Sequence, residues 1–203
     1  MTESTFNLIV YIWIAIALII FPFVLRIKAP YGRHTTTSWG PLINNKLGWV
    51  IMESPALLFF ACFFLFGSKH HTFVPWLFFS FWVFHYINRT LIFPLRLRTK
   101  GKKMPLAIVL MAICFNLVNG FINGYYLGSL SGNYELSWLY DPRFLSGAFL
   151  FISGLVINWQ SDNILIHIRN PEKRDTAFPG VAFLLIFPAR TISVKSLNGP
   201  GLH

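Results

Sequence analysis

Charged side chains are scarce in this chain of 203 residues, and acidic ones are the scarcest. Only 12% of the residues are Asp, Glu, Lys or Arg, whereas 55% are hydrophobic and 18% are aromatic. Soluble domains carry about twice that share of charge, so the composition excludes this class and indicates a membrane protein. In a membrane protein, a net charge of +10 is explained by Lys and Arg residues in the loops at the membrane surface. We therefore expect no nucleic-acid partner.

Other absences narrow the class further. There are only two cysteines, Cys62 and Cys114, and both lie in apolar stretches, so a disulfide framework is not expected. No glycine-rich dinucleotide fingerprint of the soluble kind occurs, and we expect no metal site. Residues 1–7 lack a positive charge, and no small-residue cleavage site follows, so the first apolar run should remain as a helix rather than act as a cleaved signal.

Five apolar runs are long enough to span a bilayer, which takes roughly 18 to 25 residues. The predicted fold is therefore all-α, a polytopic membrane helix bundle with five clear transmembrane helices and one later, short apolar run. The predicted spans are 8–25, 49–66, 73–95, 105–127 and 144–168.

The basic residues lie mainly in alternate connections between these runs. The first and third connections hold four and five Lys or Arg, whereas the second and fourth hold one each. The positive-inside rule then places the amino terminus outside and the basic loops in the cytoplasm. We expect a multi-pass protein of the endoplasmic reticulum in a eukaryote, or of the inner membrane in a bacterium.

Ionisable groups within a span cost on the order of 2.5 to 3.5 kcal/mol each at its centre, so each is a functional candidate. Glu53, Tyr86 and Asp162 fall at similar shallow depths on the predicted cytoplasmic side, which predicts a polar cavity between helices. Four further candidates lie in the predicted cytoplasmic halves of the third and fifth spans: His85, Arg89, Asn158 and His167.

Several of these residues also have a plain structural interpretation. Arg89 and His167 could extend to the headgroups, and Asn158 and Asp162, which share one helix face, could join helices. Three asparagines in the fourth span recur on one face with two glycines, and helix packing or ligand binding would explain them equally well: Asn116, Asn119, Asn123, Gly120 and Gly124.

A series of short motifs then resembles one family, in its order and spacing, over about residues 25–171. They are YGRHT at 31–35, MESP at 52–55, HYINRT at 85–90, NGFINGYYL at 119–127, YDPRF at 140–144 and INWQSDNIL at 157–165. Together they resemble the steroid 5-alpha-reductase family, and its animal and plant steroid reductases more than its polyprenol or enoyl-CoA branches.

The resemblance implies a seven-helix fold and NADPH-dependent reduction of the 4,5 double bond of a 3-oxo-4-ene steroid or a similar enone. It assigns Glu53 and Tyr86 to the substrate carbonyl, and Glu53 would have to be protonated to donate a hydrogen bond. Asn158, Asp162 and Arg169 match the family's cofactor positions, and Arg89, with His85, would orient Tyr86 or reach the cofactor. NADPH is implied by the resemblance alone.

The resemblance weakens after Arg174. We therefore expect a reductase-like domain over 1–174 and a divergent tail over 175–203, as if the family's carboxyl-terminal region were missing or frameshifted. The apolar run 178–187 is too short to span a bilayer. On this interpretation the chain binds NADPH weakly or not at all and is weakly active or inactive.

Two other functional classes stay open. One is a non-enzymatic membrane protein that binds a sterol or another lipid, and the other is a small transporter or a lipid methyltransferase. A small hydrophobic substrate and membrane lipid are the expected partners, and no obligate protein partner is evident.

Overall fold

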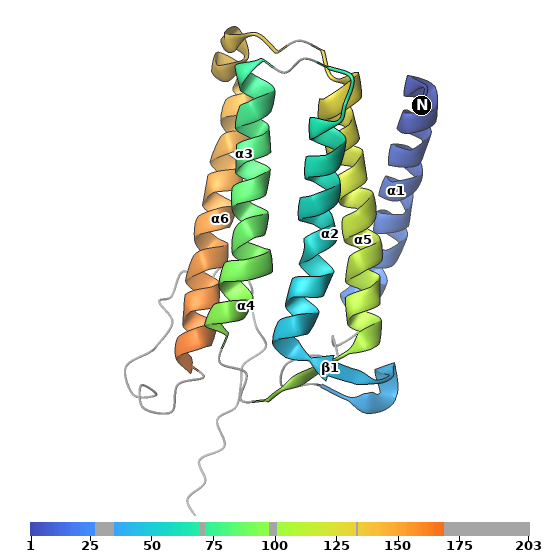
Figure 1. The fold of residues 1–203 in the computed structure, drawn as a ribbon, viewed down its shortest axis with the longest axis vertical. Coiled ribbons are helices and arrows are strands. Elements are labelled where there is room, and N and C mark those ends of the chain that lie inside the picture. Colours follow the sequence, from blue (N-terminus) through green and yellow to red (C-terminus); the bar gives the residue numbers. More distant parts are fainter. Residues whose placement is uncertain (27–34, 70–71, 98–100, 133, 169–203) are drawn as a thin grey trace, which may run out of the picture.

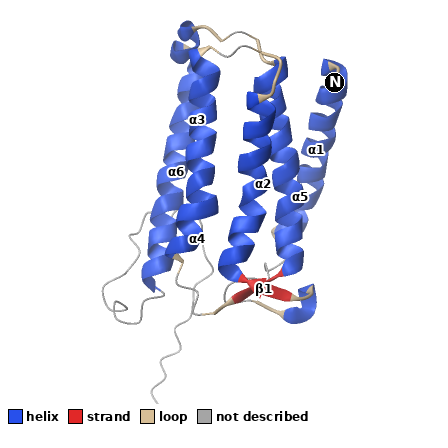
Figure 2. Cartoon of the chain, in the orientation of Figure 1, coloured by secondary structure: helices blue, strands red, loops and turns tan. Residues whose placement is uncertain are grey.

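The chain forms a bundle of long helices, seen in a computed structural model that describes residues 1–26, 35–69, 72–97, 101–132 and 134–168 (Figure 1). The predicted all-α class is confirmed, because helices dominate the cartoon (Figure 2). The long helices are α1 (Glu3–Val24), α2 (Asn45–Leu65), α3 (Phe73–Ile87), α5 (Leu106–Tyr125) and α6 (Pro142–Ile168).

Four helical segments are long and apolar enough to cross a membrane: Glu3–Val24, Asn45–Leu65, Leu106–Leu130 and Pro142–Asn163. They match four of the five predicted spans. The third predicted span, 73–95, is also helical, but it is divided into α3, the π-helix η3 (Asn88–Ile92) and α4 (Phe93–Arg96). The π-helical turn ends two residues before Pro94, whose ring and missing N–H interrupt the α-helical hydrogen-bond ladder.

Helices α2 and α5 form the most extensive contact in the bundle. Glycines on α5 allow this approach: a Cβ on Gly124 would lie 2.7 Å from the backbone oxygen of Phe60. The same helix continues into a second π-helical turn, η4 (Tyr126–Leu130). Small residues that let two backbones meet closely are a common means of helix association in membranes.

A short two-stranded antiparallel sheet closes one end of the α2–α5 pair. Strands β1 (Leu42–Asn44) and β2 (Lys103–Pro105) pair with Ile43 opposite Met104. The side chain of Asn44 caps α2 by accepting hydrogen bonds from the backbone N–H groups of Lys46 and Leu47. Met104 packs with Met52 and Val109 in a buried cluster, which ties the two helix starts together.

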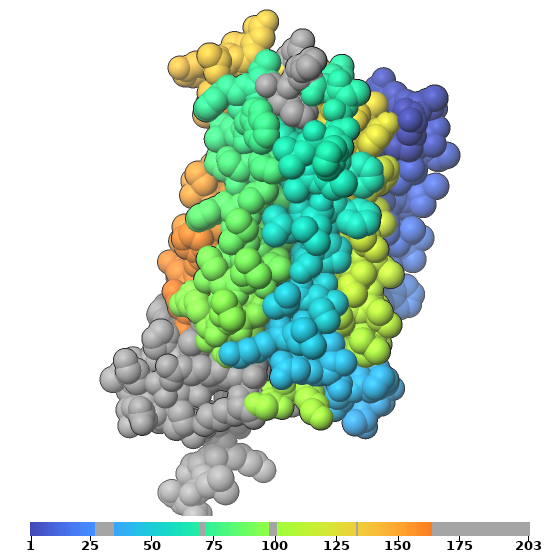
Figure 3. All heavy atoms as spheres, in the orientation of Figure 1, coloured from blue at the N-terminus to red at the C-terminus, as the bar shows by residue number. Residues whose placement is uncertain are grey.

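Helix α1 lies at the edge of the bundle, beside α5 (Figure 1). Its contacts are aromatic, with ring centres 5.9 Å apart for Phe6 and Tyr125 and 5.8 Å apart for Trp13 and Phe115. The space-filling view shows the side chains of α2 and α3 meeting along the face toward the viewer (Figure 3). Short 3-10 helices, η2 (Thr37–Trp39) and η5 (Leu136–Tyr140), lie in the connections.

Candidate functional site

Arg89 lies between two carboxyl groups that come from different helices. One guanidinium nitrogen is 3.5 Å from a carboxyl oxygen of Glu53 on α2, and another is 3.6 Å from a carboxyl oxygen of Asp162 on α6. The three side chains are only 12–15% exposed. Because buried charges are costly unless they are paired, we treat the three residues as one unit, the Arg89 cluster.

Two aromatic rings hold the guanidinium of Arg89 in place. Its central carbon lies 4.6 Å from the ring centre of Trp49 and 5.0 Å from that of Phe93. The two rings meet edge to face at 5.0 Å. A cation over an aromatic face is stabilised by the ring quadrupole, so the cation is oriented as well as paired.

Glu53 is bound through both of its carboxyl oxygens. One faces Arg89, and the other lies 3.4 Å from the side-chain nitrogen of Asn116 on α5. The same nitrogen donates to the backbone oxygen of Met52 at 2.6 Å. Helix α5 therefore fixes the position of Glu53 on α2.

Tyr86 is oriented by a chain of two asparagines on α5. The side-chain nitrogen of Asn119 donates to the phenolic oxygen of Tyr86 at 3.3 Å. Asn123 donates to the side-chain oxygen of Asn119 at 3.1 Å and to its backbone oxygen at 2.9 Å. Because the amide oxygen of Asn119 already accepts from Asn123, its NH₂ group turns to Tyr86, and the hydroxyl hydrogen of Tyr86 remains for another acceptor.

Aromatic neighbours complete the surroundings of Tyr86. The ring of His85 stands edge to face at 5.1 Å, and the ring of Trp82 lies at 4.9 Å. Glu53 and Arg89 are close enough to Tyr86 to interact with it electrostatically. The arrangement thus places an oriented hydroxyl donor beside a carboxyl group and a cation in a mostly apolar environment.

Comparison with known proteins gives consistent matches to one family. A family profile described as 3-oxo-5-alpha-steroid 4-dehydrogenase matches residues 102–189. Steroid 5-alpha-reductase DET2 of Gossypium hirsutum is 38% identical over 148 residues, which is 70% of this chain and 57% of that protein. The DET2 protein of Arabidopsis thaliana is 36% identical, covering 75% of this chain and 60% of its own length.

An animal relative matches over a longer stretch. The 3-oxo-5-alpha-steroid 4-dehydrogenase 1 of Bos taurus is 30% identical over 174 residues, which is 83% of this chain and 66% of that protein. The chain belongs to the steroid 5-alpha-reductase family. It spans between 57% and 66% of the length of these three relatives.

The family profile extends past Arg174, to residue 189. The predicted boundary between a domain over 1–174 and a tail over 175–203 lies outside the described residues and stays a prediction. Arg169 and the side chain of His167, both candidates from the sequence, also lie outside the described part of the chain.

The remaining site residues predicted for this steroid 5-alpha-reductase family member lie within the part of the chain that the structure describes. The structure joins Glu53, Arg89 and Asp162 directly, and Tyr86 is joined to α5 instead. The side-chain oxygen of Asn158 is buried without a hydrogen-bond partner among the described residues. The predicted catalytic and cofactor-binding roles of these residues stay predictions.

Two parts of the site were not anticipated from the sequence. Arg96 donates a hydrogen bond to Asn163, one residue beyond the Asp162 of the Arg89 cluster. Trp49 contributes an aromatic face to Arg89. The four-residue spacing of Trp49 and Glu53 places them on one helix face, and this signal could have suggested that they share a partner.

Outside the spans, at the opposite end of the bundle, two groups titrate abnormally. Hydrogen bonds from the Arg143 side chain lower the pKa of Asp141 to about 2. Burial, helped by a hydrogen bond with Tyr126, raises the pKa of Tyr134 to about 12. Both groups therefore keep their usual protonation states near neutral pH.

Proposed function

We propose that this chain is the reductase part of an NADPH-dependent enzyme that reduces the 4,5 double bond of a 3-oxo-4-ene steroid or a similar flat enone. The observation that carries the proposal is that α5 binds Tyr86 and Glu53 from positions three residues apart, through the side chains of Asn119 and Asn116. Membership of a family whose relatives are named steroid 5-alpha-reductases supports the substrate class.

Tyr86 would act on the carbonyl oxygen of the enone. Adding a hydride to the β carbon moves negative charge onto that oxygen, and a fixed donor stabilises this charge more than it stabilises the ground state. The hydrogen bond from Asn119 to the phenolic oxygen polarises the Tyr86 hydroxyl and strengthens it as a donor.

Glu53 would supply the second donor. The Arg89 cluster contains one cation and two carboxyl groups, so a single proton on one carboxyl makes the cluster neutral overall. A neutral cluster costs less free energy in an apolar environment than a net negative one. With that proton on Glu53, its O–H group can donate to the same carbonyl oxygen.

The residues around Asp162 fit a nicotinamide nucleotide. Asn158 offers a buried amide oxygen without a partner among the described residues, one turn before Asp162 on α6. Such an oxygen can accept from a carboxamide N–H or a ribose hydroxyl, and Asp162 can accept from another. The bound cofactor would supply the hydride, and the paired Arg89 would keep Asp162 in place.

Product formation tests the proposed reaction. Membranes containing the full chain are incubated with NADPH and either a 3-oxo-4-ene steroid or the corresponding 3-hydroxy-5-ene steroid, and products are identified by mass spectrometry. We expect the enone to gain two hydrogens, at a low rate in a chain expected to be weakly active, and the 3-hydroxy-5-ene steroid, which lacks a conjugated carbonyl, to remain unchanged. Binding of the enone without reduction would instead support a sterol-binding protein.

We further propose that the amino terminus faces the outside and the Arg89 cluster faces the cytoplasm, in an endoplasmic reticulum or bacterial inner membrane. The excess of Lys and Arg in the first and third connections supports this orientation. A reporter fused after Lys103 should be cytoplasmic and one inserted at Gly132 should be outside. The reverse result would separate the cluster from cytoplasmic NADPH.

A further inference from the structure

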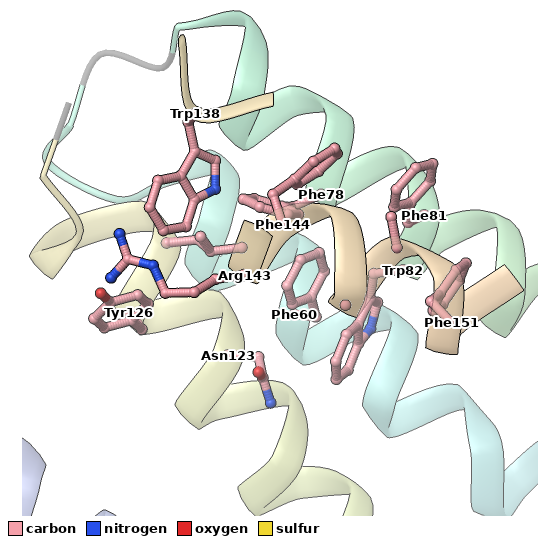
Figure 4. A pocket seen from close by; sticks show the side chains of 13 residues that line it. Phe60, Phe78, Phe81, Trp82, Asn123, Tyr126, Trp138, Arg143, Phe144 and Phe151 are labelled. Carbon is pink, nitrogen blue, oxygen red and sulfur yellow. The ribbon is translucent and has the colours of Figure 1, made fainter. Parts of the chain in front are cut away.

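A cavity of about 380 Å³ is lined by residues of α2, α3, α5, η4, η5 and α6 (Figure 4). Small-molecule sites usually measure about 300 to 1,000 Å³, so the cavity is large enough for a compact ligand. Its walls are mostly aromatic rings from several elements: Phe60, Phe78, Phe81, Phe144 and Phe151.

Trp82 separates this cavity from Tyr86. Its indole nitrogen donates to the backbone oxygen of Ala56 at 3.0 Å, and its ring stacks on Phe60 at 4.5 Å. Tyr86 is also in contact with Trp82, with ring centres 4.9 Å apart. Trp82 lines the cavity, whereas neither Tyr86 nor the Arg89 cluster does. The cavity is therefore distinct from the site that holds the proposed reaction.

The cavity contains a hydrogen-bond donor without a partner. The indole nitrogen of Trp138 is buried and makes no hydrogen bond within the described part of the chain. Figure 4 shows this nitrogen on the side of the indole that faces Phe78 and Phe144. An indole can only donate, and a buried donor is costly to leave unpaired, so an acceptor on a ligand would satisfy it.

The charge at the mouth of the cavity is already paired. Arg143 donates to the two carboxyl oxygens of Asp141 at 2.8 and 2.9 Å, and its guanidinium lies 4.5 Å from the ring centre of Trp138. The NH₂ group of Asn123 is occupied by Asn119. These contacts leave no uncompensated charge to attract an anion or a cation, so they favour an uncharged ligand.

We propose that this cavity is a second ligand site, which binds an uncharged, flat, mostly apolar molecule whose carbonyl oxygen accepts a hydrogen bond from Trp138. The rigid aromatic walls suit fused or planar hydrocarbon rings. A sterol-like ketone has this chemistry. Binding here does not depend on the reductase reaction.

The probe for a test is a sterol ketone that carries a photoreactive diazirine, added to the purified full chain in lipid nanodiscs. Labelled peptides identify where it binds. We expect competable labelling of α3 and α6 residues that line the cavity. Trp138→Phe keeps an aromatic side chain, although a smaller one, and removes the N–H, so it should weaken binding about three- to tenfold. Equal affinity for the two proteins would overturn the role of Trp138.

Two glycines on α6 provide a matched pair of variants. A Cβ on Gly147 or on Gly154 meets nothing within 4 Å, but only Gly147 lines the cavity. Gly147→Leu should fill the cavity and abolish labelling, whereas Gly154→Leu should leave labelling unchanged. Equal labelling of both variants overturns the site.

The Gly147→Leu and Gly154→Leu variants also show whether a segment of this chain, rather than a ligand, occupies the cavity. If Gly147→Leu lowers the melting temperature of the probe-free protein and Gly154→Leu does not, a segment of this chain occupies the cavity, and the proposal is wrong. Labelling spread over exposed apolar residues of α1 would mean partition into lipid and would also overturn it.

Discussion

The side-chain amide of Asn119 on α5 donates a hydrogen bond to the phenolic oxygen of Tyr86 on α3 at 3.3 Å. Asn123 fixes the direction of this amide by donating to its oxygen at 3.1 Å. The phenolic oxygen of Tyr86 therefore accepts a hydrogen bond from α5, and its O–H group can donate to a different acceptor. The sequence left Asn119 and Asn123 open between helix packing and ligand binding. In the structure they form the hydrogen-bonded chain that positions Tyr86, the proposed donor.

Asn119→Leu tests this relationship, because the side chain keeps about the same size and branching but offers no hydrogen-bond donor to Tyr86 and adds no charge. We expect kcat for enone reduction to fall about tenfold, since a hydrogen bond of this kind contributes about 0.5 to 1.5 kcal/mol, with little change in KM. Steady-state kinetics in membranes provide the measurement. An unchanged kcat with a raised KM would assign Asn119 to substrate binding instead.

Arg89→Met should destabilise the fold, because it leaves Glu53 and Asp162 buried without their cation. Breaking a buried ion pair by removing one partner costs about 3 to 5 kcal/mol. The double variant Arg89→Met with Asp162→Asn should recover part of this loss. Unfolding followed by circular dichroism in detergent gives the differences.

The Arg143–Asp141 pair is the control for this variant. Its nitrogen–oxygen distance of 2.8 Å is shorter, but the Arg143 side chain is 75% exposed. Exposed pairs contribute about 0 to 1 kcal/mol, so Arg143→Met should have a small effect on stability. Equal losses in both variants would show that the Arg89 cluster is not held together by charge.

The sequence predicted the bundle well because membrane spans leave a strong signal in composition. It did not predict the π-helical turn at Asn88–Ile92, since hydropathy is the same for α and π geometry. It also did not predict the pairing of β1 with β2. These strands are three residues long and far apart in the sequence, too short for a periodic pattern.

The sequence predicted how deep each site residue lies along its span, but it did not predict which residues contact one another. Counting residues along each span placed Glu53 and Asp162 at similar depths, and both contact Arg89. The count does not give the rotation of one helix about its axis relative to the next. For that reason the sequence left Asn119 open between packing and binding, and the structure shows its hydrogen bond to Tyr86.

Gly124→Ala should destabilise the α2–α5 contact. The added Cβ would lie 2.7 Å from the backbone oxygen of Phe60, and backbone cannot move aside as a flexible side chain can. Overpacking of this kind costs about 1 to 3 kcal/mol. Gly147→Ala, where the Cβ meets nothing, should be neutral or stabilising by up to about 1 kcal/mol in the same unfolding assay. Equal behaviour of the two variants would exclude close packing at Gly124.

The Asp141–Arg143 pair predicts a specific acid dependence of stability. The pKa of Asp141 is lowered to about 2 by hydrogen bonds from Arg143, so the folded state favours the carboxylate. Its stabilising effect is therefore complete above the unfolded value of about 3.9 and is lost as the pH falls toward 2. The difference in melting temperature between the parent protein and Asp141→Asn should be constant from pH 5 to 7 and shrink below pH 4. A difference that grows on acidification would contradict the pairing.

The most direct test of the proposed reaction compares the parent protein with Glu53→Gln and Tyr86→Phe for reduction of a 3-oxo-4-ene steroid by NADPH. The same comparison is made in a hybrid that carries the carboxyl-terminal region of the Gossypium hirsutum relative, because the chain matches 57% of that protein. Removing one donor to a developing oxyanion lowers kcat about 100- to 1,000-fold, and we expect this loss in each variant. Undiminished rates in both variants, or no product from either parent, would contradict the account.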